Sequence, residues 1–87
     1  MNILFEVPIE PKELHIVFQG GFAGKECAVL VEKDGRWEQV MDFWPDDVNE
    51  RQIFRFNSSI TGQHFQIVFK SSSDFFGRIT IYDLDVL

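Results

Sequence analysis

Basic residues are few in this sequence, and they are scattered. The 87 residues include 8 Lys or Arg against 14 Asp or Glu, which gives a formal net charge of −6. Binding to nucleic acid and adhesion to anionic lipid both depend on clustered Lys and Arg. The composition therefore argues against direct binding to nucleic acid or to a membrane surface.

Cysteine is nearly absent, and there is no long apolar run. The one cysteine, Cys27, has no second cysteine with which to form an internal disulfide, which is typical of a reducing compartment. No apolar stretch approaches the ~20 residues that a membrane-spanning helix needs. The opening MNILFEVPIE also lacks the basic start and long apolar core of a signal peptide. We expect an intracellular protein, nuclear or cytoplasmic.

Helical periodicity is missing as well. No window of helical length repeats its apolar residues every three to four positions. The segment PDDVNERQ, residues 45–52, could form one helical turn, because Pro45 and the acids after it suit a helix start. Any helix in this chain is therefore expected to be short.

Alternation of apolar and polar residues with a period of two is present instead. It runs through residues 3–7, 13–19, 27–33, 37–43, 53–56, 64–70 and 78–87, with short turns between the runs. Such runs are typical of β-strands, and Asp34-Gly35 suits a tight hairpin turn. The pattern predicts a single all-β domain over residues 1–87, an antiparallel β-sandwich or barrel.

If successive strands run antiparallel, their connections alternate between the two ends of the domain. The links at residues 8–13, 32–36 and 57–63 then share one end, and those at 19–26, 42–51 and 71–77 share the other. The second end gathers aromatic and acidic residues: Phe22, Phe43, Trp44, Phe75 and Phe76 with Asp42, Asp46, Asp47, Glu50 and Asp74. We interpret it as the candidate binding end.

Alternation also predicts where the aromatic side chains of this end point. Neighbouring residues of a strand face opposite ways, so one of Phe75 and Phe76 should face inward while the other lies at the rim. Phe22 is flanked by Gly21 and Ala23 and is expected to be exposed. At least one residue of the pair Phe43-Trp44 should be core.

Five segments, in this order, resemble the discoidin (coagulation factor 5/8 type C) family: ILFEV, ELHIVFQGG, KDGRW, HFQIVFKSS and FFGRITIYDL. Gln19-Gly20, Asp34-Gly35, Trp37 and Arg78 stand at the family's motif positions. The resemblance implies a galactose-binding-like jelly roll that binds through loops at one end. It places Phe22 at the tip of a recognition loop. Family members carry an opening segment before the ILFEV-like strand, so we expect an N-terminally shortened form.

The segments FQGGF, DFWPDD and SSDFFGRITIYDLDVL are similar to a small intracellular branch of this family. This likeness implies binding to a protein partner, an orphan nuclear receptor, and repression of that receptor rather than catalysis. The partner-binding residues that we predict are Phe22, Trp44, Asp46, Asp47, Asp74, Phe75 and Phe76. Arg78 could be a ligand cation, but we favour a structural pair with Asp74.

Catalysis, cofactors and metals find little support in the sequence. His15 and His64 lie within strand patterns, and no Ser, His and acid grouping is indicated. The oxygen ligands of residues 46–50 would suit Ca²⁺, but their spacing differs from that of an EF-hand loop, and a solvated loop is favoured. Two alternatives to protein binding stay open: a glycan-binding module, and a structural subunit that completes its sheet in a larger assembly. An open sheet edge would also favour a homo-oligomer.

Overall fold

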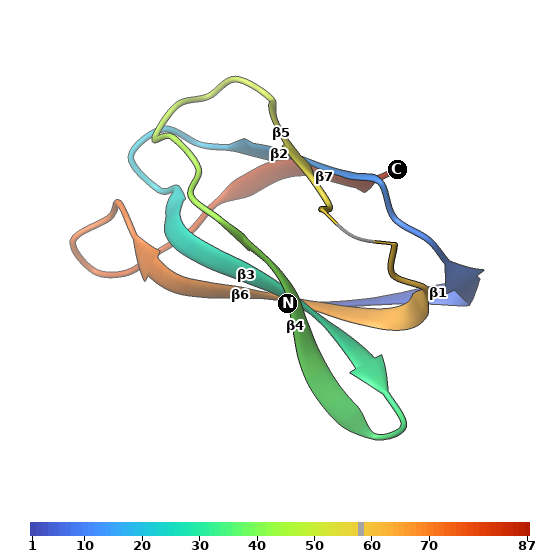
Figure 1. Ribbon diagram of the computed structural model, residues 1–87. Coiled ribbons are helices and arrows are strands. Elements are labelled where there is room, and N and C mark those ends of the chain that lie inside the picture. The colour runs from blue at the N-terminus through green and yellow to red at the C-terminus, as the bar shows by residue number, and fades with distance from the viewer. Residues whose placement is uncertain (58) are drawn as a thin grey trace.

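The computed structural model describes residues 1–57 and 59–87, and all regular structure in that part of the chain is β-strand. The strands are β1 (Asn2–Ile9), β2 (Glu13–Phe18), β3 (Gly24–Lys33), β4 (Arg36–Phe43), β5 (Gln52–Arg55), β6 (Gly62–Ser72) and β7 (Ile81–Val86). They form two sheets that face each other (Figure 1). The predicted all-β sandwich is confirmed.

The two sheets contain strands that are distant in sequence. One sheet has the order β1-β6-β3-β4 and the other has the order β5-β2-β7. Every neighbouring pair is antiparallel. The chain therefore changes sheet at every connection except the β3–β4 hairpin, as a sandwich with long-range strand pairing requires.

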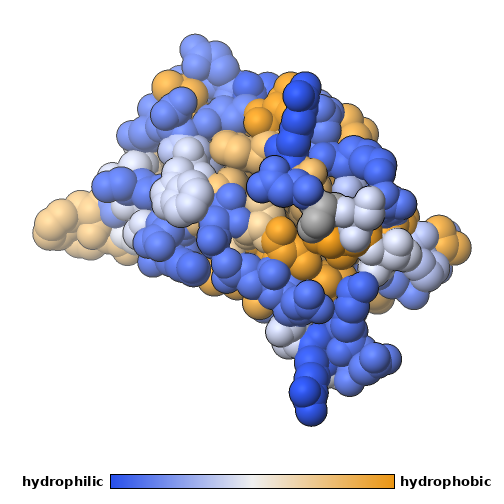
Figure 2. Space-filling model, in the orientation of Figure 1, coloured by the Kyte–Doolittle hydropathy of each residue, from blue (hydrophilic) through white to orange (hydrophobic). Residues whose placement is uncertain are grey.

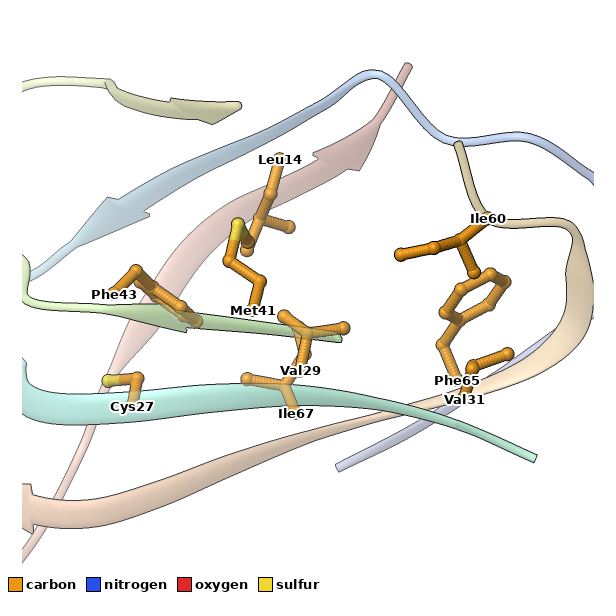
Figure 3. Close-up of a cluster of buried hydrophobic side chains, with 9 residues drawn as sticks. All are labelled: Leu14, Cys27, Val29, Val31, Met41, Phe43, Ile60, Phe65 and Ile67. Atoms are coloured by element: carbon orange, nitrogen blue, oxygen red, sulfur yellow. The ribbon is translucent and has the colours of Figure 1, made fainter. Parts of the chain in front are cut away.

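The core forms where the alternating apolar residues of the two sheets meet. Leu14, Ile16 and Phe18 of β2 are buried. Leu14 belongs to a cluster with Val29 of β3 and Ile67 of β6, and Ile16 and Phe18 form a smaller cluster with Ala23. Figure 3 shows buried side chains from both sheets pointing into this shared space. Burial of such apolar side chains is the main favourable term in folding.

The turn between β3 and β4 has the conformation that its sequence predicts. Asp34 has φ 52° and Gly35 has φ 79°, and two successive residues with positive φ are typical of the tight hairpin turn that suits twisted strands. This expectation is confirmed.

Two expectations about local structure are wrong. Residues 45–52 contain no helical turn: residues 47–50 form bends, and Gln52 begins β5. The Gln52 side chain holds Asp46 on both sides, since the Asp46 N–H donates to Oε1 (2.7 Å) and Nε2 donates to the Asp46 carbonyl (2.9 Å). The last strand begins at Ile81 rather than at Arg78. Both segments lie at the same end of the sandwich.

Candidate functional site

Three loops meet at one end of the sandwich: residues 19–23, 44–51 and 73–80, here called the loop end. Figure 1 shows them together at the left, opposite the hairpin turn at residues 34–35 and the links that follow β1 and β5. The prediction that these three connections share one end is confirmed. The first of them lies between the other two and is bonded to both.

Side-chain oxygens of the 44–51 loop hold the glycines of the 19–23 loop. The N–H of Gly20 donates to Oδ1 of Asn49 (2.7 Å), and the N–H of Gly21 donates to Oδ1 of Asp47 (2.8 Å). A Cβ at position 20 would lie 3.2 Å from the Asn49 Oδ1, so the close approach favours glycine there. Asp47, a predicted partner-binding residue, is therefore also a structural residue.

The 73–80 loop is bonded to the other side of the 19–23 loop through the backbone. Ser73 N–H donates to the Ala23 carbonyl (2.8 Å), and Thr80 N–H donates to the Phe22 carbonyl (2.9 Å). The Ala23 N–H donates in turn to Oγ of Ser73 (2.9 Å). The three loops therefore form one connected surface.

The most prominent part of the loop end is a tight turn at residues 74–77, here called the aromatic turn. The Gly77 N–H donates to the Asp74 carbonyl (3.0 Å), and Gly77 has φ 80°, a value that favours glycine. The Asp74 carboxylate accepts the backbone N–H groups of Phe76 (3.2 Å) and Arg78 (3.0 Å). Its own hydrogen bonds thus fix the turn.

Both phenylalanines of the aromatic turn face solvent. Phe75 is 93% exposed and Phe76 is 78% exposed, and their rings lie edge to face with centroids 5.2 Å apart. An apolar lobe projects at the position of this turn at the left of Figure 2. The expectation that one of the two faces inward is wrong, because strand alternation does not apply in a turn that Asp74 and Gly77 bend out of the sheet.

Phe22 is less exposed than the sequence predicts. It is half-buried rather than exposed, and the Arg78 guanidinium carbon lies 5.1 Å from its ring centroid. The same carbon lies 5.6 Å from the centroid of Phe76. Arg78 thus stacks between the 19–23 loop and the aromatic turn, a cation–π arrangement that stabilises both.

The predicted pair between Arg78 and Asp74 is confirmed. Nε of Arg78 donates to Oδ2 of Asp74 (3.0 Å), and an Arg78 terminal nitrogen donates to Oδ1 (3.3 Å). The Arg78 side chain, followed by the backbone N–H groups, lowers the pKa of the Asp74 carboxyl below its ordinary value of 3.8. Arg78 is therefore a positioning residue.

We expect the aromatic turn to withstand mild acid. Because the folded pKa of Asp74 is lowered, its stabilising contribution is complete above pH 3.8 and is lost as the pH falls through the folded value. The amide NMR shifts of Phe76 and Arg78 should then stay constant down to about pH 4 and move only in stronger acid. Asp74→Asn should abolish that transition. A transition above pH 5 in the parent protein would contradict the assignment.

Trp44 lies at the loop end, where it borders a surface depression that the aromatic turn does not line. It is 65% exposed, and it lines a shallow depression with Gln39, Asp42 and Asn57. Its neighbour Phe43 is buried and packs on Phe54, with ring centroids 4.8 Å apart. The expectation that one of this pair is core is confirmed.

The loop end carries excess negative charge. Arg78 is paired with Asp74, and Arg51 forms an ion pair with Asp83. Three acids of the 44–51 loop are exposed: Asp46, Asp47 and Glu50. The part of the loop end that residues 44–51 form is therefore acidic, and the 19–23 loop lies between it and the aromatic turn.

Groups that could perform other chemistry are engaged or buried. In residues 1–57 and 59–87, no three His, Cys, Asp or Glu side chains are close enough to hold a metal ion. Cys27 is buried, and desolvation raises the pKa of its thiol to about 11, so it is a poor nucleophile. His15 and His64 contact Glu13 and Glu32 at 3.0 and 3.2 Å. The described chain also contains no helix long and apolar enough to cross a membrane.

Sequence reasoning missed the serines that support the aromatic turn. Oγ of Ser72 donates to the Arg78 carbonyl (2.6 Å) and accepts the N–H of Asp74 (3.0 Å). Serine and aspartate side chains commonly bond to backbone groups two residues away. The run SSSD followed three residues later by Gly77 was therefore a turn signal.

The chain matches no protein-family model. It is similar to proteins called nuclear receptor 2C2-associated protein: 40% identity with that of Danio rerio, 41% with that of Xenopus laevis and 34% with that of Homo sapiens. These matches cover 98%, 98% and 100% of this chain but 62%, 64% and 63% of the relatives. The chain thus spans less than two thirds of their length.

One solved structure has a similar fold. It is CBM32-1 from a family 31 glycoside hydrolase of Clostridium perfringens, with a TM-score of 0.78 at 21% sequence identity. The match covers 98% of this chain and 66% of the other. It confirms the galactose-binding-like, discoidin-like sandwich.

Proposed function

We propose, from its similarity to the nuclear receptor 2C2-associated proteins, that the chain is a non-enzymatic module that binds a protein partner through its loop end. The partner is a nuclear receptor of the 2C2 type, and binding represses it. The aromatic turn is the observation that carries this proposal.

The aromatic turn has the properties of a binding anchor. Exposed aromatic pairs are costly in water unless a partner covers them, and buried aromatic anchors dominate the energetics of interfaces. The hydrogen bonds of Asp74 fix the backbone of the turn before binding. Arg78 stacks on the ring of Phe76, and the ring of Phe75 packs edge to face on that of Phe76. A preorganised anchor loses little conformational entropy when it binds.

The acids of the loop end add selectivity. Asp46, Asp47 and Glu50 are exposed on the 44–51 loop, and acidic rims favour basic partner surfaces and raise the association rate. The partner surface that fits is thus an apolar pocket for the two phenylalanines with Lys or Arg beside it.

Calorimetry with the purified full-length receptor 2C2 from the same organism tests the proposal. We expect saturable binding that weakens as salt rises, because the rim interactions are screened. A receptor-driven reporter should fall when the protein is co-expressed. Absence of binding at low salt, with both proteins folded, would sink the proposal.

Glycan binding is the second candidate, and one observation favours it. The hollow beside Trp44 combines an exposed aromatic face with the polar side chains of Gln39, Asp42 and Asn57, and sugar sites need an aromatic platform beside hydrogen-bonding groups. A glycan array with the parent and Trp44→Ala separates the candidates. Array binding that Trp44→Ala removes, with no receptor binding, would favour the glycan.

A further inference from the structure

β1 is an edge strand whose outward backbone groups have no neighbour in its sheet. Met1 and Ile67 exchange both backbone hydrogen bonds, at 3.0 and 2.8 Å, and Asn2, Ile3 and Leu4 lie opposite Gln66, Phe65 and His64. In an antiparallel ladder, hydrogen-bonded and non-hydrogen-bonded pairs alternate. The N–H and C=O groups of Asn2 and Leu4 therefore point away from β6.

Four of the first five side chains along this edge are apolar, and the exception is Asn2. Leu4 is 72% exposed and Met1 is 47% exposed, while Ile3 and Phe5 are only partly buried where they pack on the core. Ile3 and Val86 of β7 also line a narrow apolar slot between the two sheets. The core is thus incompletely covered along β1.

Of the other three edge strands, β4 and β7 carry more charge than β1, and β5 is half as long, with 4 residues against 8. β4 includes Arg36, Glu38 and Asp42, β7 includes Asp83 and Asp85, and the short β5 includes Arg55. The one charged residue of β1 is Glu6. Charges, short length, proline and bulges protect an edge against strand addition. Pro8 and the register shift of β1 both lie after Leu4, so its first residues are the least protected edge segment.

We propose that β1 is a homodimer interface in which the β1 strands of two copies pair antiparallel about a two-fold axis at Ile3. In this register Asn2 lies opposite Leu4 of the second copy, and Leu4 lies opposite its Asn2. Each of these pairs exchanges both outward backbone hydrogen bonds. The pairing joins the two four-stranded sheets into one continuous sheet.

This register places apolar side chains of the two copies opposite each other. Ile3 meets Ile3, and Met1 meets Phe5, so the inner row of each copy covers that of the other with apolar side chains. Glu6 lies beyond the paired segment and does not face Glu6 of the second copy. This register therefore avoids placing like charges opposite each other, which would be destabilising. Gln63 Nε2 donates to the carbonyls of Phe5 (2.8 Å) and Glu6 (3.2 Å), and the register of β1 shifts after Leu4. The regular pairing therefore ends at Phe5.

The interface leaves the loop end free. β1 lies opposite residues 62–67 of β6, whereas the loop end follows Ser72 at the other end of that strand. A dimer of this kind presents two aromatic turns, and its formation does not depend on the proposed receptor binding.

The variant Ile3→Cys tests the register covalently. Ile3 would form a non-hydrogen-bonded pair across the axis, where Cα atoms lie about 4.5 Å apart, within the range that a disulfide spans. Buried Cys27, with its thiol pKa raised to about 11, does not compete. We expect a disulfide-linked dimer under mild oxidation. The matched variant Leu4→Cys should link far less, because its cysteines face Asn2.

Light scattering over a dilution series tests the dimer without a new cysteine. The parent should have twice the monomer mass of 10.2 kDa at high concentration. Leu4→Pro should stay monomeric and folded, because proline removes an outward N–H that β6 does not use, whereas Leu4→Thr should still dimerise. A parent that is monomeric throughout, or a dimer that Ile3→Cys does not link, would overturn the proposal. A monomer that captures a foreign strand at β1 would assign the edge to another occupant and equally refute the homodimer.

Discussion

Replacing both Phe75 and Phe76 by serine is expected to abolish detectable receptor binding while leaving the fold intact. Aromatic anchors cost about 2 kcal/mol or more each when they are truncated, and about 1.4 kcal/mol is tenfold in affinity. The affinity of the double variant for the receptor should therefore fall roughly 100-fold or more. The two rings contribute little to the core, since Phe75 is 93% exposed and Phe76 is 78% exposed, so stability should change by about 0.5 kcal/mol or less.

Calorimetry gives the affinity of this double variant, and urea unfolding gives its stability. The matched control is Ile53→Ser, which removes an exposed apolar side chain from β5 outside the loop end and should bind as the parent does. Retained affinity in the double variant would mean that the receptor contacts another surface. A large loss of stability would instead show that the rings support the fold.

The strands and the shared loop end were predictable because local burial determines them. One face of each strand meets the core, so apolar residues repeat every second position, as in Leu14, Ile16 and Phe18. Once successive strands alternate in direction, the end at which each loop lies follows without knowledge of which strands pair. The aromatic and acidic residues could thus be assigned to one end from the sequence.

The orientation of individual side chains at that end was not predictable by the same rule. Phe75 and Phe76 are both exposed because Ser72, Asp74 and Gly77 form a turn from side-chain hydrogen bonds and a positive φ. Phe22 is half-buried because Arg78, distant in sequence, stacks on it. These contacts depend on which loops meet, and alternation along one strand contains no information about them.

Sheet order was equally beyond local pattern. β1 lies beside β6, and β6 lies beside β3, pairings that join residues far apart in sequence. Several registers would bury the same alternating residues of such strands, and tertiary packing selects among them. The unprotected edge at β1 is identified only by this strand order, whereas the sequence alone predicts an open edge without assigning it to a strand.

Phe18→Ala is expected to have the largest effect on stability, and it separates the scaffold from the binding surface. Phe18 is fully buried at the end of β2, directly before the 19–23 loop, and packs edge to face on Phe69 with ring centroids 6.2 Å apart. Together with Ile16 and Ala23 it forms a small buried cluster. Truncation of a buried phenylalanine costs about 3–5 kcal/mol, a large part of the stability of a domain this small.

The melting temperature should accordingly fall by at least about 12 °C, since each kcal/mol corresponds to roughly 4–8 °C in a domain of 60–100 residues. Phe18→Leu is the matched control and should lose less, because it leaves a smaller cavity. Below its melting temperature, Phe18→Ala should still bind the receptor in proportion to the folded fraction, unlike the double variant of the aromatic turn. A fall of only a few degrees would mean that Ile16, Phe69 and the 19–23 loop move to fill the cavity left by the truncation. The core beneath the loop end would then not be rigid.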